Sequence, residues 1–234
     1  MASATATRSA PEGVLRTSIG KKLLMAGSGV VLLGFIIFHE LGNLKVYLGL
    51  KEFNGYAAGL RTLGEPIFPR TYLLWGARII LYSAFVVHII TAIQLSRQSR
   101  AARKTRYEHP GRVQANPASS TMRWGGLALL LFLIFHLAMF TWGWIHPGYT
   151  FVRGHAYQNL VSGFGIWWID VIYLVAMVAL SLHIFHGTWS IFQTFGVNDK
   201  RWDRRVRAAA TGLALFVLVG NCSIPIAVFA GGVK

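Results

Sequence analysis

Five long apolar runs dominate the chain, and polar stretches with Gly, Pro or clustered charge separate them. They cover roughly residues 23–41, 72–95, 124–145, 165–192 and 208–230. A helix needs about 20 residues to cross the hydrocarbon core of a bilayer, and the runs are close to or above that length. The strand alternation of a membrane barrel is absent, and backbone groups in lipid must be paired within a helix. The pattern therefore predicts an all-α integral membrane bundle of five transmembrane helices.

The first run begins near the amino terminus, so a cleaved signal peptide is the alternative to a membrane span. The run is longer than a typical signal core and no Ala-x-Ala type processing site follows it, which favours a span. Residues 1–17, rich in Ala, Ser and Thr, are interpreted as a flexible inner tail. Residues 18–234 are predicted to form a single five-helix transmembrane domain.

Composition and charge add an orientation to this bundle. Hydrophobic residues make up 54% of the chain and charged residues 13%, which is the balance of a protein dissolved in lipid. The net charge is +15, and sixteen cations precede or follow the spans on one side against six on the other. This positive-inside bias predicts an inner N-terminus, an outer C-terminus and no nucleic-acid partner. The basic inner face is expected to hold anionic lipid headgroups or a docked protein.

Each of the first four predicted spans contains a candidate histidine, namely His39, His88, His136 and His183, and the fourth span also contains His186. A histidine in hydrocarbon usually faces the bundle interior and has a partner there. At ~1.5 Å per residue, His39 lies about 24 Å and His136 about 18 Å from the inner starts of their spans. On the same scale, His88 lies about 10 Å and His183 about 14 Å from the inner ends of theirs. The four residues therefore form an outer pair, His39 and His136, and an inner pair, His88 and His183.

Two imidazoles at equal depth on neighbouring helices match the requirements of one haem with both axial positions filled. Such ligation suits electron transfer rather than oxygen binding. Each pair lacks the third or fourth ligand that zinc or copper would require. The single cysteine, Cys222, allows no internal disulfide and no cysteine-ligated cluster. The pattern favours two haems, and histidines with purely structural hydrogen bonds are the alternative.

Four sequence stretches in order point to a known family. They are Ser18-Ile-Gly-Lys-Lys-Leu-Leu-Met-Ala, Phe38-His-Glu-Leu-Gly-Asn, Ser120-Thr-Met-Arg-Trp-Gly with Phe135-His-Leu, and His183-Ile-Phe-His-Gly-Thr-Trp-Ser-Ile-Phe-Gln. Together they resemble the single-chain, five-helix dihaem cytochrome b subunit that anchors succinate dehydrogenases and fumarate reductases in the membrane. The resemblance runs from about Thr17 to Gly196.

The resemblance implies a ligand set of four iron-coordinating histidines. His88 and His183 would bind the inner haem b, nearer the iron–sulfur subunit, and His39 and His136 would bind the outer haem b. The family ligand lies four residues before the glycine of a Gly-x-Trp-Ser stretch, which selects His183 over His186. Glu40 departs from the family, where an apolar residue usually follows the histidine. We interpret Glu40 as facing the outer interface, with tuning of the haem or proton uptake as the alternative.

The resemblance also implies partners and a location, since the chain has neither the length nor the fold for a flavin domain. A flavoprotein subunit and an iron–sulfur subunit would dock on the basic inner face, in the cytoplasmic membrane of a bacterium. Electrons would pass between the iron–sulfur subunit and a membrane quinone, with menaquinone as the expected substrate. The subunit would thus serve the tricarboxylic acid cycle and respiratory electron transport, and the complex could associate into a higher oligomer.

A quinone pocket needs an aromatic wall and hydrogen-bond donors near a haem edge. Trp189, Ser190 and Gln193 offer these within one helical turn, although an interfacial aromatic belt explains them equally well. Asp170 is a second acidic residue at span depth; we expect it at the solvated surface, with acceptance of quinol protons as the alternative. Two other functions stay open: a dihaem b subunit of another respiratory dehydrogenase or reductase, and a haem-free transporter that uses buried histidines.

Overall fold

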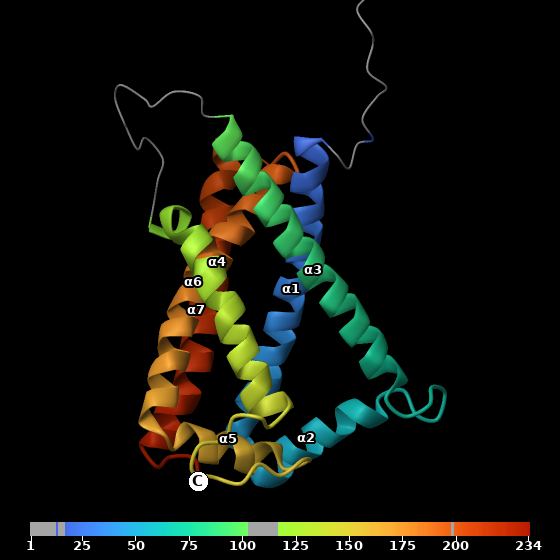
Figure 1. The fold of residues 1–234 in the computed structure, drawn as a ribbon, viewed down its shortest axis with the longest axis vertical. Coiled ribbons are helices and arrows are strands. Elements are labelled where there is room, and N and C mark those ends of the chain that lie inside the picture. Colours follow the sequence, from blue (N-terminus) through green and yellow to red (C-terminus); the bar gives the residue numbers. More distant parts are fainter. Residues whose placement is uncertain (1–12, 14–16, 103–116, 198) are drawn as a thin grey trace, which may run out of the picture.

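The computed structural model describes residue 13 and residues 17–102, 117–197 and 199–234. For residues 117–121 it describes the backbone alone. All regular elements in this part of the chain are helices, as the sequence predicts, and Figure 1 shows their arrangement. The elements are α1 (Ser18–Asn43), η2 (Leu44–Leu48), α2 (Leu50–Thr62), α3 (Tyr72–Ala101), α4 (Pro117–His136), η3 (Leu137–Thr141), α5 (Ala156–Phe164), α6 (Trp167–Thr194) and α7 (Lys200–Phe229). Of the predicted tail, only Gly13 and Thr17 belong to the described residues.

Five of these helices are long and apolar enough to cross a membrane, one for each apolar run. Their boundaries differ from the prediction where a polar residue caps the helix. The Thr17 side chain accepts a hydrogen bond from the Gly20 amide at 3.1 Å, so α1 begins before its apolar run. The Asp199 carboxylate likewise accepts from the Arg201 amide, and α7 begins at Lys200 rather than 208. Hydropathy alone underestimates both helices, because their first turns carry charged residues.

The third span ends earlier than predicted, at Thr141 rather than 145. Its last turn, η3, is a π-helix, in which each backbone amide bonds one residue further back than in an α-helix. Gly143 follows with φ of +68°, a conformation that favours glycine, and the Phe151 ring packs where a side chain would project. The chain therefore leaves the helix in a tight turn.

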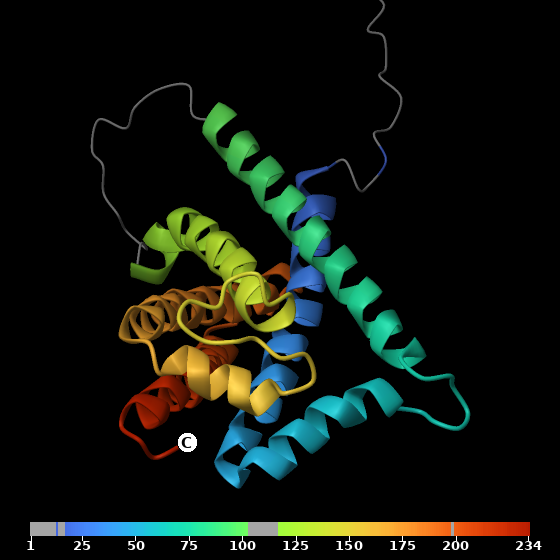
Figure 2. The same ribbon diagram turned by 60° about the horizontal axis from the view of Figure 1, so that its bottom comes forward.

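Two segments between the predicted spans contain the shorter helices α2 and α5, which Figure 2 shows lying across one end of the bundle. They contact each other through Asn54 of α2, whose side chain donates to Gln158 at 3.0 Å and accepts from the Tyr157 amide at 2.9 Å. The Phe53 and Tyr157 rings meet edge to face beside these bonds. Neither helix is long enough to cross a membrane, because α2 has 13 residues and α5 has 9.

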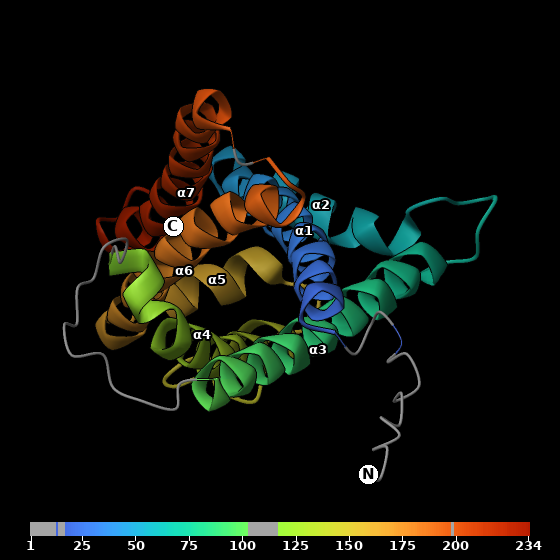
Figure 3. The ribbon, with the colours of Figure 1, turned by 90° about the horizontal axis from the view of Figure 1, so that it is seen from above.

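The spans pack around two central helices, α1 and α6 (Figure 3). Helix α6 packs against α1, α4 and α7, and α1 also packs against α3 and α7. Five of the ten combinations of spans show no extensive packing in the described part of the chain, and two of the five are α1 with α4 and α3 with α6. These are the two helix combinations that carry the outer and the inner histidine pair.

The two ends of the bundle differ strongly in charge. The starts of α1, α4 and α7 and the ends of α3 and α6 share one end, at the top of Figure 1, which we call the basic end. Its described cations are Lys21, Lys22, Arg97, Arg100, Arg123, Lys200, Arg201, Arg204, Arg205 and Arg207. Helices α2 and α5 and the C-terminus lie at the opposite end, with fewer cations.

Candidate functional site

The outer pair comes together in the structure. His39 lies one turn before the end of α1, and His136 is the last residue of α4. Their ring centroids are 5.8 Å apart, with the ring planes at 89°. Both rings belong to helix ends next to α2 and α5, so the pair lies toward the end opposite the cations.

The inner pair also comes together. His88 lies in α3 and His183 in α6, with ring centroids 6.2 Å apart and ring planes at 63°. The ring that meets His88 is that of His183 and not that of His186. Both residues lie in the half of their helices that runs toward the basic end.

The spacing of both pairs fits a shared metal ion. Metal to imidazole bonds of about 2 Å place the centroids of two rings on opposite sides of one ion about 6 Å apart. Edge-to-face ring contacts occur over the same range, so the spacing by itself does not distinguish the two arrangements. Among the described residues, no group of three or more His, Cys, Asp or Glu side chains could hold a metal ion. Two imidazoles can serve as the axial ligands of a planar macrocycle, so the residues present are compatible with a haem.

The helix arrangement supports that fit. A macrocycle between two axial histidines separates the two helices that carry them, so those helices cannot pack directly. In both pairs the histidines come from helices that do not pack against each other in the described structure. The rings nevertheless approach across this separation, which is the geometry that a plate held on both faces requires.

Aromatic side chains and one hydroxyl surround the outer pair. The Tyr173 hydroxyl of α6 lies 3.1 Å from Nδ1 of His136 and is buried. Phe35 stacks on His39 at 5.2 Å, while Phe132 and Phe140 flank His136 at about 6 Å. With Nδ1 bonded to Tyr173, the Nε2 atom of His136 is the one left to coordinate a metal.

The inner pair has fewer polar contacts. Ser28 of α1 approaches Nδ1 of His88 at 3.4 Å and also donates to the Leu24 carbonyl at 2.7 Å. Nδ1 of His183 is buried without a hydrogen-bond partner among the described residues. Gly29 of α1 adjoins this site, since a Cβ atom there would lie 3.6 Å from Cε1 of His88, an ordinary van der Waals distance. His186 lies one turn further along α6, and its ring contacts Trp189.

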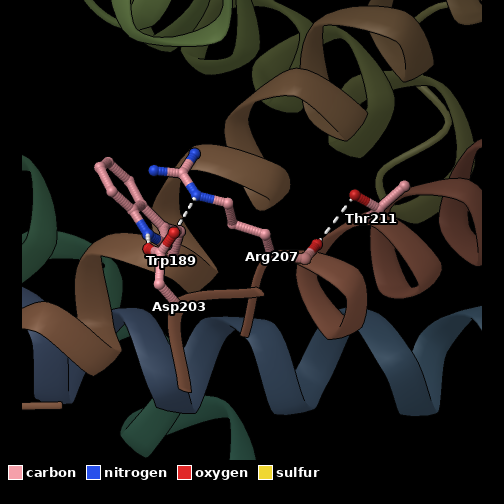
Figure 4. A network of polar contacts seen from close by, with 4 residues as sticks. All are labelled: Trp189, Asp203, Arg207 and Thr211. Carbon is pink, nitrogen blue, oxygen red and sulfur yellow. Dashed lines mark hydrogen bonds and ion pairs between the residues drawn. The ribbon is translucent and has the colours of Figure 1, made fainter. Parts of the chain in front are cut away.

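The three predicted quinone residues have different surroundings in the structure. The indole N–H of Trp189 donates to Asp203 of α7 at 2.9 Å, and the Arg207 guanidinium lies 4.2 Å from the centroid of the indole (Figure 4). The Arg207 Nε atom also pairs with Asp203 at 2.8 Å. Trp189 thus connects α6 to α7, while the Ser190 carbonyl accepts a hydrogen bond from the Thr194 hydroxyl and Gln193 is exposed. A quinone site at these residues stays a prediction.

Two acidic residues lie elsewhere than expected. Glu40 is fully buried rather than facing the outer interface, because the Asn221 amide of α7 donates to its carboxylate. Gly220 makes room for it, since any side chain there would collide with the carboxylate of Glu40. Asp170, expected at the surface, is 6% exposed, and its oxygens have no partner among the described residues. Outside the spans, burial raises the pKa of the Tyr149 phenol above its ordinary value.

Comparisons of the chain with protein-family models, with curated proteins and with solved structures found no match. The histidine geometry and the motifs of the sequence therefore carry the functional proposal.

Proposed function

We propose that this chain is the dihaem cytochrome b membrane anchor of a succinate dehydrogenase or fumarate reductase type complex. The observation that carries the proposal is the presence of two imidazole pairs at two depths, with centroids 5.8 and 6.2 Å apart. Each pair comes from two helices that are otherwise not packed together. The ordered motifs from Ser18 to Gln193 favour this family over other respiratory b subunits.

The residues of the chain would hold two b haems by their axial positions. His39 and His136 would coordinate the outer one through Nε2, and His88 and His183 would coordinate the inner one. Tyr173 and Ser28 would orient His136 and His88 by hydrogen bonding to the ring nitrogen that does not coordinate the metal, as the hydrogen-bond partners of metal-bound histidines commonly do. When bound, each haem would supply a one-electron iron centre.

Helix α6 sets the two sites at different depths. It carries Tyr173 toward its start and His183 ten residues later, about 15 Å along the helix axis. The outer pair therefore lies near the α2 and α5 end, and the inner pair lies nearer the basic end. Two sites along the bundle axis suit transfer of electrons across the membrane between a soluble donor and a quinone.

The basic end is the docking face in this proposal. It would lie on the cytoplasmic side of a bacterial membrane, where the positive-inside rule places clustered Lys and Arg. An iron–sulfur subunit would dock there, and a flavoprotein subunit with the dicarboxylate site would bind to it in turn. The quinone, with menaquinone as the expected one, would reach the subunit from the lipid.

A redox titration of the purified chain tests the proposal, with b-type absorbance as the readout. The wild type should show two transitions, and His39→Ala and His183→Ala should each remove a different one. His186→Ala is the matched control, since it makes the same change one turn from His183 and should keep both transitions. Absence of b-type absorbance would leave the transporter hypothesis standing. Loss of the same transition in both variants would contradict the pairing.

A further inference from the structure

A cavity of about 530 Å³ lies at the basic end, between the last turns of α6 and the first turns of α7. This volume falls in the range of about 300–1,000 Å³ that small-molecule sites occupy. Apolar and aromatic residues form most of its lining, namely Phe192, Val197, Trp202, Val206 and Ala209. Arg205 and Asp199 are the polar side chains at its edge.

Positive charge surrounds this cavity. The Arg205 guanidinium lies 5.3 Å from the centroid of the Trp202 ring, and both side chains are exposed. Lys200, Arg201 and Arg204 add three exposed cations within the same two turns of α7. The Asp199 carboxylate caps the start of α7 by accepting from the Arg201 amide, so the helix already uses this negative charge. A ligand with an anionic head is therefore favoured over a neutral one.

The walls of the cavity are held in place by the network of Figure 4. Trp189 lies one turn before Phe192 on α6, and Asp203 lies one turn before Val206 on α7. The Trp189–Asp203 hydrogen bond and the contact of Arg207 with the Trp189 ring link the two helices at this level, and the Asp203–Arg207 ion pair within α7 holds the carboxylate in place. A preformed cavity loses less conformational freedom on binding than a mobile one does.

We propose that this cavity binds one anionic phospholipid of the membrane leaflet at the basic end. Its phosphate would pair with Arg205, and an acyl chain would lie along Phe192, Val206 and Ala209. Basic pockets between transmembrane helices recognise anionic headgroups in this manner, and Trp residues gather at the same interfacial level. A quinone would also suit the aromatic lining, but a neutral quinone leaves the surplus of cations unexplained.

This site does not depend on the haem proposal, because no histidine of either pair contributes to it. A negative result would remove the lipid site and leave the two imidazole pairs untouched. Conversely, a chain without haem could still bind lipid here.

Native mass spectrometry of the full chain, released from nanodiscs, tests the proposal. The nanodiscs contain phosphatidylcholine and phosphatidylglycerol, and the readout is the phosphatidylglycerol retained per chain. Arg205→Gln should reduce retention about fivefold, the contribution of one cation near a membrane surface. Arg97→Gln is the matched control, since it removes an exposed cation from the same end outside the cavity. Circular dichroism verifies that each variant is folded.

A second variant tests the cavity without changing charge. Ala209→Trp should fill the space between α6 and α7 and abolish specific retention of phosphatidylglycerol. Equal losses in Arg97→Gln and Arg205→Gln would mean that surface charge alone attracts the lipid. Full retention by Ala209→Trp would overturn the site, and so would a bound quinone lost from Arg205→Gln with no change in lipid.

Discussion

The outer and inner histidine pairs have nearly the same ring separation and very different surroundings. His136 is bonded to a buried tyrosine and enclosed by phenylalanine rings. His88 has only a longer approach from Ser28, and Nδ1 of its partner His183 has no partner in the described structure. Helix depth fixes the spacing of a pair, whereas its chemical environment depends on neighbours from distant parts of the chain. Two histidine pairs with nearly the same ring separation can therefore differ in stability and in redox potential.

The largest effect is expected from a substitution that disrupts the inner histidine pair alone. Gly29→Leu would place a bulky side chain against His88 and Ile191, which a Cβ atom would already meet at 3.6 and 3.7 Å. The inner redox transition should disappear and the outer one should stay. The measurement is a redox titration of the purified variant.

Gly27→Leu is the control for this change, because nothing lies within 4 Å of a Cβ atom at Gly27. It should leave both transitions in place. If Gly29→Leu also abolished the outer transition, the two pairs would not be independent sites.

The second largest effect is a loss of stability at the outer end of the bundle. Asn221→Ala would remove the amide that donates to the buried Glu40 carboxylate, and an unsatisfied buried polar group costs about 1–3 kcal/mol. The free energy of unfolding in detergent should decrease by that amount. Ser223→Ala, two residues along the same helix, should lose less of the free energy of unfolding, because the Ser223 hydroxyl pairs with the exposed Tyr47. An equal loss in the two variants would count against a specific role for Asn221.

A smaller effect should separate the potentials of the two sites. In Tyr173→Phe, Nδ1–H of His136 loses its acceptor, so the imidazole becomes a weaker electron donor and the reduced form is favoured. A net hydrogen bond of about 0.5–1.5 kcal/mol corresponds to about 20–60 mV for a one-electron couple. The outer midpoint potential should rise by up to that amount, as measured by potentiometric titration. A shift of the inner potential instead would contradict the assignment of Tyr173 to the outer pair.

The smallest effect is expected for Ser28→Ala at the inner pair. Its 3.4 Å approach to His88 is longer than an ordinary N–H···O bond, and its own proton already goes to the Leu24 carbonyl. The inner midpoint potential should rise by less than about 20 mV, the lower bound for one net hydrogen bond. Ser83→Ala, an exposed serine on α3, should cause no shift. A larger shift for Ser28→Ala than for Tyr173→Phe would reverse the ranking of the two environments.

The five spans and the four paired histidines could be predicted from the sequence, because both follow from one-dimensional quantities. Apolar length identifies a membrane helix, and the rise per residue converts position into depth. Depth brings His39 to His136 and His88 to His183 without any knowledge of packing. It would also have suggested Tyr173, which lies about 12 Å from the outer start of its predicted span, close to the depth of His136.

The contacts that the sequence did not predict depend on which faces of the helices meet. Glu40 looked like an interfacial residue because its partner Asn221 lies 181 positions away on the last span. Gly29 gave no signal that distinguished it from Gly27, although only the former adjoins His88. Trp189 offered a donor in the sequence, but Asp203 of the next helix uses that donor in the structure. Helices α2 and α5 were missed because they are stabilised by contact with each other rather than by lipid.

We propose that two pairs of imidazoles each hold one iron porphyrin between helices that do not pack together. The number of haem b groups extracted per purified chain, determined from the absorbance of the pyridine complex after saturation with haem, tests this proposal. We expect two haem groups for the wild type, one for His136→Ala and none for His136→Ala combined with His183→Ala. A wild-type chain that is folded in the membrane and binds no haem would contradict it.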